Sequence, residues 1–153
     1  MNSKEKTLQL LQEVASDITA GAQQHFMHAT INIQKGYIKL GNRMMDEYNE
    51  EMANVAKIIN RILELGGTPT TLKAASYPAI YTEAESQLRN ECQEQFEGLE
   101  QLEQMIQATE LDIVTKDFFV DYMKEETAHA TWLKQQVDLI ESIGLQNYLA
   151  KQL

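Results

Sequence analysis

The sequence has a single cysteine, Cys92, and only two prolines, Pro69 and Pro78, among its 153 residues. One cysteine cannot form a disulfide within the chain, which fits a reducing compartment. No apolar run approaches the roughly 20 residues that a membrane-spanning helix requires, and the polar stretch 1–7 lacks the apolar core of a signal peptide. We therefore expect a cytoplasmic protein that has no membrane partner.

Positive charge is scarce as well, because 13 lysines and arginines stand against 23 aspartates and glutamates and leave a formal net charge of -10. A protein that binds nucleic acid needs a basic face to contact phosphates, so nucleic acid is excluded as a partner. The acidity has two interpretations: an ordinary solvated surface, or an electrostatic field that attracts cations.

Apolar residues recur at intervals of three and four along four long segments, which is the spacing of amphipathic helices. Gly36, Gly66 and Gly144 follow three of these segments, and glycine commonly closes a helix. Thr82 and Glu85 have the spacing of a capping box before the third segment. The predicted helices span 5–35, 38–65, 82–109, 113–143 and, for a short fifth helix, 145–152.

The segment between the second and third predicted helices decides the topology. The second helix, 38–65, would be about 42 Å long at ~1.5 Å per residue, and the linker 66–81 would span up to about 50 Å if extended. Pro69 and Pro78 favour such a path. A linker that runs the length of the bundle makes the second and third helices parallel. The sequence therefore predicts one all-α domain, 1–153: a four-helix bundle with a long crossover and a short fifth helix.

Polar residues interrupt the apolar core lines halfway along the predicted helices. They are Glu51, Asn54, Gln95, Glu126 and His129, while Ile18 stands at the matching level of the first helix. Buried carboxylates are unfavourable unless they bind a cation or one another. Di-iron sites in four-helix bundles take one glutamate from each of two helices and a Glu-x-x-His pair from each of the other two. The clustering therefore suggests a metal site.

Only three of those six ligands are present: Glu51, Glu126 and His129. The spacing of Glu126 and His129 places both side chains on one helix face. Asn54 and Gln95 supply neutral amide oxygens, and two carboxylates are too little negative charge for two iron ions. Two interpretations stay open. One is a weak single-metal site; the other is a metal-free network in which burial raises the glutamate pKa values and a shared proton or a His129–carboxylate pair compensates.

Two single residues also need an interpretation. His25 has no aligned carboxylate three residues away and is interpreted as a hydrogen-bonded core or interface residue. Gly21 lies in the middle of the first predicted helix, where glycine costs about 1 kcal/mol relative to alanine. We interpret it as allowing a close helix approach.

Five runs of residues are similar to those of a known family: Phe26-Met27-His28-Ala29, Glu50-Glu51-Met52, Arg61-Ile62-Leu63-Glu64-Leu65-Gly66-Gly67, Trp132-Leu133 and Gly144-Leu145-Gln146-Asn147-Tyr148-Leu149. The chain resembles the bacterioferritins, and the similarity extends from end to end. The resemblance implies a ferritin-like fold and a hollow shell of twenty-four subunits that stores oxidised iron. It also implies b-type haem at each twofold dimer interface, held by one methionine from each subunit, and Met52 occupies that position.

Met52 also stands out on helical geometry, because it lies about 100° around the helix from Glu51 and cannot face the same core. A second apolar stripe on this helix consists of Met45, Tyr48, Met52, Ala56, Ile59 and Leu63. A helix that is apolar on two faces must bury both, so a partner subunit is expected to cover this stripe. Met52 either packs there as a gap-filler or ligates haem iron. By resemblance, Phe26, Gln23 and Thr19 line the haem pocket.

The chain departs from the family at the di-iron ligands, because Ile18, Asn54 and Gln95 replace a glutamate, a histidine and a glutamate. Some bacterioferritins combine an oxidising subunit with a haem-binding subunit, and this chain resembles the second type. The resemblance then implies a haem-bearing storage subunit that is not a ferroxidase on its own. Its partners would be a second copy across haem b, a ferroxidase-competent bacterioferritin subunit in a hetero-oligomer, and a ferredoxin that supplies electrons for iron release.

Two other functions stay open. One is an active ferroxidase with a remodelled site made of Glu51, Glu126 and His129, with Glu94 rotated inward. The other is a purely structural bundle without a cofactor.

Overall fold

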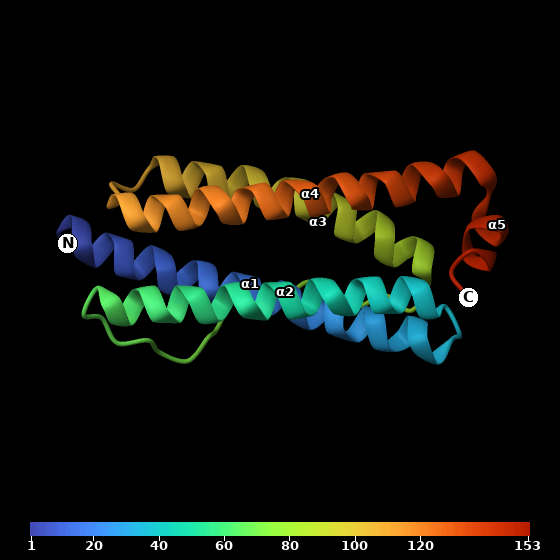
Figure 1. Cartoon of the computed structure of the whole chain (residues 1–153), viewed down its shortest axis with the longest axis horizontal. Helices are drawn as coiled ribbons and strands as arrows, with labels where there is room; N and C mark the ends of the chain where they lie inside the picture. Colours follow the sequence, from blue (N-terminus) through green and yellow to red (C-terminus); the bar gives the residue numbers. More distant parts are fainter.

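The computed structural model describes all 153 residues and contains four long helices and one short helix (Figure 1). They are α1 (Ser3–Gln34), α2 (Ile38–Glu64), α3 (Ala84–Gln107), α4 (Ile113–Ile143) and α5 (Leu145–Ala150). The predicted all-α four-helix bundle with a short fifth helix is therefore confirmed. No helix is both long enough and apolar enough to cross a membrane.

Two antiparallel helix pairs form the bundle, α1 with α2 and α3 with α4 (Figure 1). The linker between α2 and α3 runs back along the bundle, so α2 and α3 point the same way, as predicted. The linker lies on α1, where the Gln12 amide donates to Thr70 O (3.1 Å) and the Gln24 amide donates to Ala79 O (2.8 Å). These anchors, at well-separated points of α1, hold the linker in its extended path.

Three helices end at the glycines that the sequence marks. Gly36, Gly66 and Gly144 have positive φ angles of 92°, 79° and 85° after α1, α2 and α4. A residue with a Cβ is strained at such angles, whereas glycine is not. These three predicted helix ends are therefore confirmed.

The predicted capping box before α3 is wrong. The helix begins at Ala84, and its N-cap residue Glu83 makes no side-chain capping hydrogen bond. Thr82 is held instead through its carbonyl oxygen, which accepts a hydrogen bond from the Lys35 ammonium group at the end of α1. Lys35 also pairs with Glu83 (3.2 Å). A contact from a distant part of the chain thus fixes this turn in place of the local motif.

The close approach between α1 and α2 occurs at Gly41 and not at Gly21. A Cβ added at Gly41 would lie 2.5 Å from Ile33 Cγ1 and 2.9 Å from the Ala29 carbonyl oxygen. A Cβ at Gly21 would meet nothing within 4 Å, so the close approach predicted there is wrong. Gly21 borders a cavity instead.

Two apolar clusters fill the two ends of the bundle. One contains Leu10, Leu11, Val14, Ala15, Ile18, Val55, Ile58, Ile62, Leu102, Phe119 and Tyr122. The other contains Ala29, Leu40, Met44, Ala84, Leu88, Leu133, Ile140 and Tyr148. Between them lie buried glutamates and histidines, here called the mid-bundle layer: His25, His28, Glu47, Glu51, Glu91, Glu126 and His129. The fold therefore encloses a polar layer between two apolar halves.

Candidate metal centre

All four long helices contribute to the mid-bundle layer. The histidines and glutamates come from α1 (His25, His28), α2 (Glu47, Glu51), α3 (Glu91) and α4 (Glu126, His129). None of these residues is more than 8% exposed. Because an isolated buried charge is highly unfavourable, these groups must satisfy one another or bind a cation.

Glu51 and Glu126 form one part of the layer. The Tyr122 hydroxyl donates to Glu51 Oε2 (3.1 Å), and the Gln95 amide donates to Glu126 Oε2 (2.7 Å). Burial, together with the neighbouring Glu126, raises the pKa of Glu51 well above its usual value. This favours a protonated Glu51, as the metal-free network would require.

The three positions that break the di-iron pattern offer neither a carboxylate nor an imidazole to the layer. Ile18 is packed in an apolar cluster. The Asn54 amide nitrogen donates to Glu125 Oε2 (2.9 Å), and the Gln95 nitrogen donates also to the Glu126 backbone oxygen (3.0 Å). Amide nitrogens that donate to carboxylates are not metal ligands. The residues present therefore do not fit a di-iron pair at these positions.

Glu47 connects the expected ligands, which the structure divides between two groups. Ligand atoms of His25, Glu47 and His129 lie within 4.8 Å of one another, and so do those of Glu47, Glu51 and Glu126. The predicted set of Glu51, Glu126 and His129 is therefore split, with His129 beside Glu47. Burial, together with the charge of Glu126, raises the pKa of Glu47 to about 7.

Glu91 binds two histidines at once. His25 Nδ1 lies 2.6 Å from Glu91 Oε1, and His28 Nδ1 lies 2.8 Å from Glu91 Oε2. Burial alone would raise the pKa of Glu91, but the charge of His25 and the hydrogen bonds of both rings lower it to about 2. Glu91 is therefore a carboxylate that accepts both hydrogen bonds. His25 is buried and hydrogen-bonded, as the sequence led us to expect.

Sequence reasoning did not include Glu47, His25 or Glu91 in the site. Glu47 precedes Glu51 by four residues and so stands on the same helix face, which was the available signal. Glu91 has the same relation to Gln95. Periodicity shows which residues share a face of one helix, but it does not show which faces of different helices meet.

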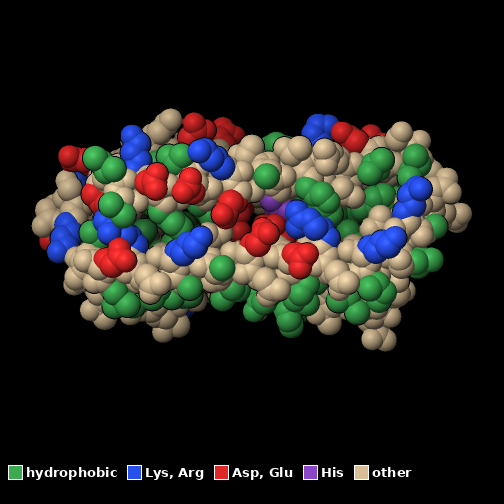
Figure 2. Space-filling view, in the orientation of Figure 1, with side chains coloured by type: hydrophobic (Ala, Val, Ile, Leu, Met, Phe, Trp, Pro, Cys, Tyr) green, Lys and Arg blue, Asp and Glu red, His purple; other side chains and the backbone are tan.

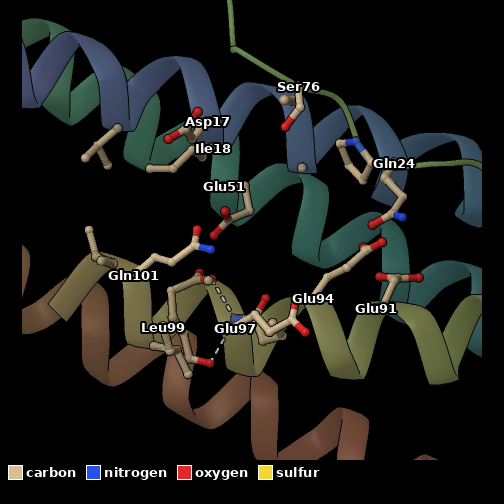
Figure 3. A pocket seen from close by; sticks show the side chains of 18 of the residues that line it. Asp17, Ile18, Gln24, Glu51, Ser76, Glu91, Glu94, Glu97, Leu99 and Gln101 are labelled. Carbon is tan, nitrogen blue, oxygen red and sulfur yellow. Dashed lines mark hydrogen bonds between the residues drawn. The ribbon is translucent and has the colours of Figure 1, made fainter. Parts of the chain in front are cut away.

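An acidic cavity of about 610 Å³ opens between α1 and α3 and reaches the mid-bundle layer. Figure 3 shows Glu51 entering this space from α2, and Glu91 and Glu94 projecting from α3. Asp17 and Glu97 also line the cavity. Carboxylates gathered in a concave wall attract cations, so this part of the acidity has a structural basis beyond a solvated surface.

The second apolar stripe of α2 lies at the margin of the bundle core, where Met45, Met52 and Ile59 are partly buried against the two apolar clusters. Met52 is half-buried, and Tyr48 on the same stripe packs against Phe26 of α1 with ring centroids 5.2 Å apart. Phe26 is 44% exposed, and Gln23 and Thr19 share its helix face. Figure 2 shows hydrophobic side chains along the edge of the molecule that α1, α2 and the linker form. The residues expected to line a cofactor pocket thus share one outward face.

Comparisons with known proteins agree with the ferritin-like bundle that the structure shows. The family model described as a ferritin-like domain matches residues 7–143. The chain is 36% identical to the "Bacterial ferritin" of Neisseria meningitidis serogroup B over 156 residues, which covers all of both chains. It is 30% identical to the "Bacterial ferritin" of Synechocystis sp., covering all of this chain and 99% of that protein. It is 26% identical to the "Bacterioferritin" of Streptomyces coelicolor, over 92% of this chain and 84% of that protein.

Proposed function

Because the chain belongs to the ferritin-like family, we propose that it is a haem-binding subunit of a bacterioferritin. The chain is a ferritin-like iron-storage protein, and the family assembles into oligomeric shells. The finer assignment, haem b at a twofold interface, rests on Met52 and the apolar face around it.

The partly exposed apolar stripe of α2 carries the haem proposal. Met52 is half-buried, and Leu63 at the end of the stripe is 55% exposed. A twofold axis beside Met52 would cover the stripe and present one thioether from each subunit to a single haem. Haem b held in this way supplies one-electron transfer across the shell wall. Phe26, Gln23 and Thr19 are the further residues proposed to line the pocket.

Oxidation of Fe(II) is assigned to partner subunits. Ile18 is apolar, and the amides of Asn54 and Gln95 donate to carboxylates, so this chain has an incomplete di-iron set. We propose a hetero-oligomer with a second, ferroxidase-competent bacterioferritin subunit. A ferredoxin is the proposed electron donor to the haem, which reduces the stored mineral for release.

An active ferroxidase with a remodelled site is the second candidate, and the position of Glu94 favours it. Glu94 is half-buried and lines the cavity that reaches Glu51 and Glu126. Rapid Fe(II) oxidation by shells of this chain alone, lost in Glu126→Ala, would support that function. Under the leading proposal, such shells oxidise Fe(II) slowly, and Glu126→Ala changes the rate little.

Met52→Leu tests the haem proposal. Leucine preserves the apolar volume of the side chain but offers no ligand atom. The variant should assemble normally and lose the haem, measured as the Soret absorbance per subunit. Met45→Leu, on the same stripe, is the matched control and should retain the band. A Soret band of undiminished intensity in Met52→Leu would contradict the proposal.

Purification from the native cell tests the proposed partner. A second ferritin-like subunit with a complete ligand set should elute in the same shell, and mass spectrometry gives the ratio of the two. Native shells made of this chain alone would refute the hetero-oligomer.

A further inference from the structure

We propose that His25, Glu47 and His129 bind one divalent transition-metal ion, at a position displaced from the di-iron centre that the family implies. The three side chains come from α1, α2 and α4 and are 7%, 3% and 4% exposed. Their ligand atoms lie within 4.8 Å of one another. Two of the three residues, His25 and Glu47, lie outside the ligand set that the resemblance gave.

The observation that points to a bound metal ion comes from His129. Neither of its ring nitrogens has a hydrogen-bond partner, although both are buried. Nδ1 lies 3.2 Å from Glu47 Oε2 without the alignment of a hydrogen bond. Two ligand atoms bound at ~2.0–2.1 Å around a tetrahedral metal ion lie about 3.3 Å apart, so this spacing suits shared coordination. A bound cation would satisfy polar atoms that otherwise destabilise the fold.

A chain of hydrogen bonds prepares His25 for the same role. The Tyr81 N–H donates to His28 Nε2 (3.0 Å), so His28 carries its proton on Nδ1 and donates it to Glu91 (2.8 Å). The other oxygen of Glu91 accepts from His25 Nδ1 (2.6 Å). A metal ion displaces the Nε2 proton of the charged His25 ring, and the lone pair on Nε2 is then available to the metal. Metal-ligating histidines commonly donate their other nitrogen to a carboxylate in this way, which makes Glu91 a positioning residue.

Trp132 and Arg43 lie on the outer side of the group. The Trp132 ring stacks on His129 with centroids 5.8 Å apart and an interplanar angle of 14°. The Arg43 guanidinium lies 4.5 Å from the Trp132 centroid, and its Nη1 is 3.6 Å from Glu47 Oε2. Arg43 thus partly neutralises Glu47 in the metal-free chain, and its side chain is half-exposed to solvent. Figure 2 shows a histidine in the hollow between α2 and α4, flanked by acidic and basic side chains.

The donor set determines the class of ion. Two imidazoles and one carboxylate with open positions suit Fe(II), and also Co(II) and Zn(II). Mg(II) and Ca(II) prefer oxygen ligands throughout and are excluded. Glu47 belongs also to the group with Glu51 and Glu126, so it joins the ion to the acidic cavity. The site goes beyond the proposed haem function, because Met52 lies on another face of α2.

Calorimetric titration with Co(II) tests the site in assembled, chelator-treated protein without oxygen. One tight Co(II) per subunit is expected. His25→Gln, Glu47→Gln and His129→Gln should each weaken this binding by about tenfold or more, and Glu91→Gln by about 10–100-fold. Glu50→Gln, an exposed control on α2, should change it by less than about threefold.

Anomalous scattering at the cobalt edge locates the ion in the wild type, so the test does not depend on any variant folding. Density between His25, Glu47 and His129 is expected, and anaerobic Fe(II) should compete for it more weakly than Co(II). Wild-type affinity no greater than that of Glu47→Gln would overturn the proposal. So would an ion lost in Glu51→Gln and Glu126→Gln but kept in His25→Gln. Haem content is a separate readout and bears on the Met52 proposal alone.

Discussion

Asp112 joins two helices through one carboxylate. As the N-cap of α4, it accepts hydrogen bonds from the Thr115 N–H (2.9 Å) and hydroxyl (2.7 Å), and it pairs with Arg61 of α2 (2.6 Å). Burial alone would raise its pKa, but these hydrogen bonds and the charge of Arg61 lower the pKa to about 2. The charged form is therefore favoured at a helix N-terminus, where it also interacts with the helix dipole.

Two substitutions at Asp112 should distinguish the stability contributed by the N-cap hydrogen bonds from the stability contributed by the charge. Asp112→Ala is expected to lower the free energy of unfolding at pH 7 by about 1–2 kcal/mol. Asp112→Asn keeps a cap, and because the side chain is 39% exposed and screened by solvent, loss of the charge should cost under about 1 kcal/mol. The folded pKa lies below the usual 3.8, so the charge stabilises the protein above about pH 4, and this stability is lost as the pH falls toward 2.

Melting temperatures measured across pH 2–7, at one subunit concentration, check this expectation. The melting temperature of the wild type should exceed that of Asp112→Asn near pH 7, and the difference should shrink as the pH falls. A difference of constant size over the whole range would contradict the assigned role of the charge.

Single side chains also mark the limit of what the sequence could predict about the site. The core lines identified Glu51, Glu126 and His129 as buried polar residues, which the structure confirms. The direction of the Gln95 amide and the position of His129 beside Glu47 depend on neighbouring helices. Such contacts cannot be predicted from the periodicity of one chain segment, so the buried layer was predictable but its pairing was not.

At the scale of the element, the helices and their connection were predictable because both follow from local properties. A 3.6-residue period and glycine at the ends define α1, α2 and α4, and the length of the linker fixes the parallel run of α2 and α3. The capping box failed because Lys35 holds the turn at Thr82. Gly21 was misinterpreted for a similar reason, since periodicity does not tell which helix approaches a glycine.

Gly41 and Gly21 therefore form a matched pair for testing where α1 and α2 approach each other. Gly41→Ala should lower the free energy of unfolding by about 1–3 kcal/mol, because the new methyl group meets Ile33 and the Ala29 carbonyl. Gly21→Ala should raise it by up to about 1 kcal/mol, because alanine favours the helix and nothing lies within 4 Å. Melting temperatures of the two variants should shift in opposite directions. Shifts of the same sign and size would show that α1 and α2 do not approach as described.

At the scale of the whole molecule, the chain has two unlike surfaces with different expected partners. The cavity between α1 and α3 gathers carboxylates that attract cations, in a chain of formal net charge -10. The outer stripe of α2 is apolar and only partly buried, with Met52 half-buried and Leu63 55% exposed. The stripe could be predicted because a helix that is apolar on two faces needs a second contact. The cavity could not, because it depends on how far the two helix pairs separate.

Leu63→Lys should weaken shell assembly while the subunit stays folded. Leu63 is 55% exposed in the single chain, so lysine there removes little from the subunit core. In a dimer that covers the stripe, the lysine must either lose its hydration or leave neighbouring apolar surface exposed, at about 25 cal/mol per Å². Glu50→Lys adds the same side chain to an exposed position of α2 away from the stripe and is the control. Light scattering after size-exclusion chromatography should show smaller species only for Leu63→Lys, with unchanged circular dichroism in both variants. A Leu63→Lys shell as large and as stable to dilution as the wild type would mean that this stripe is not a subunit interface.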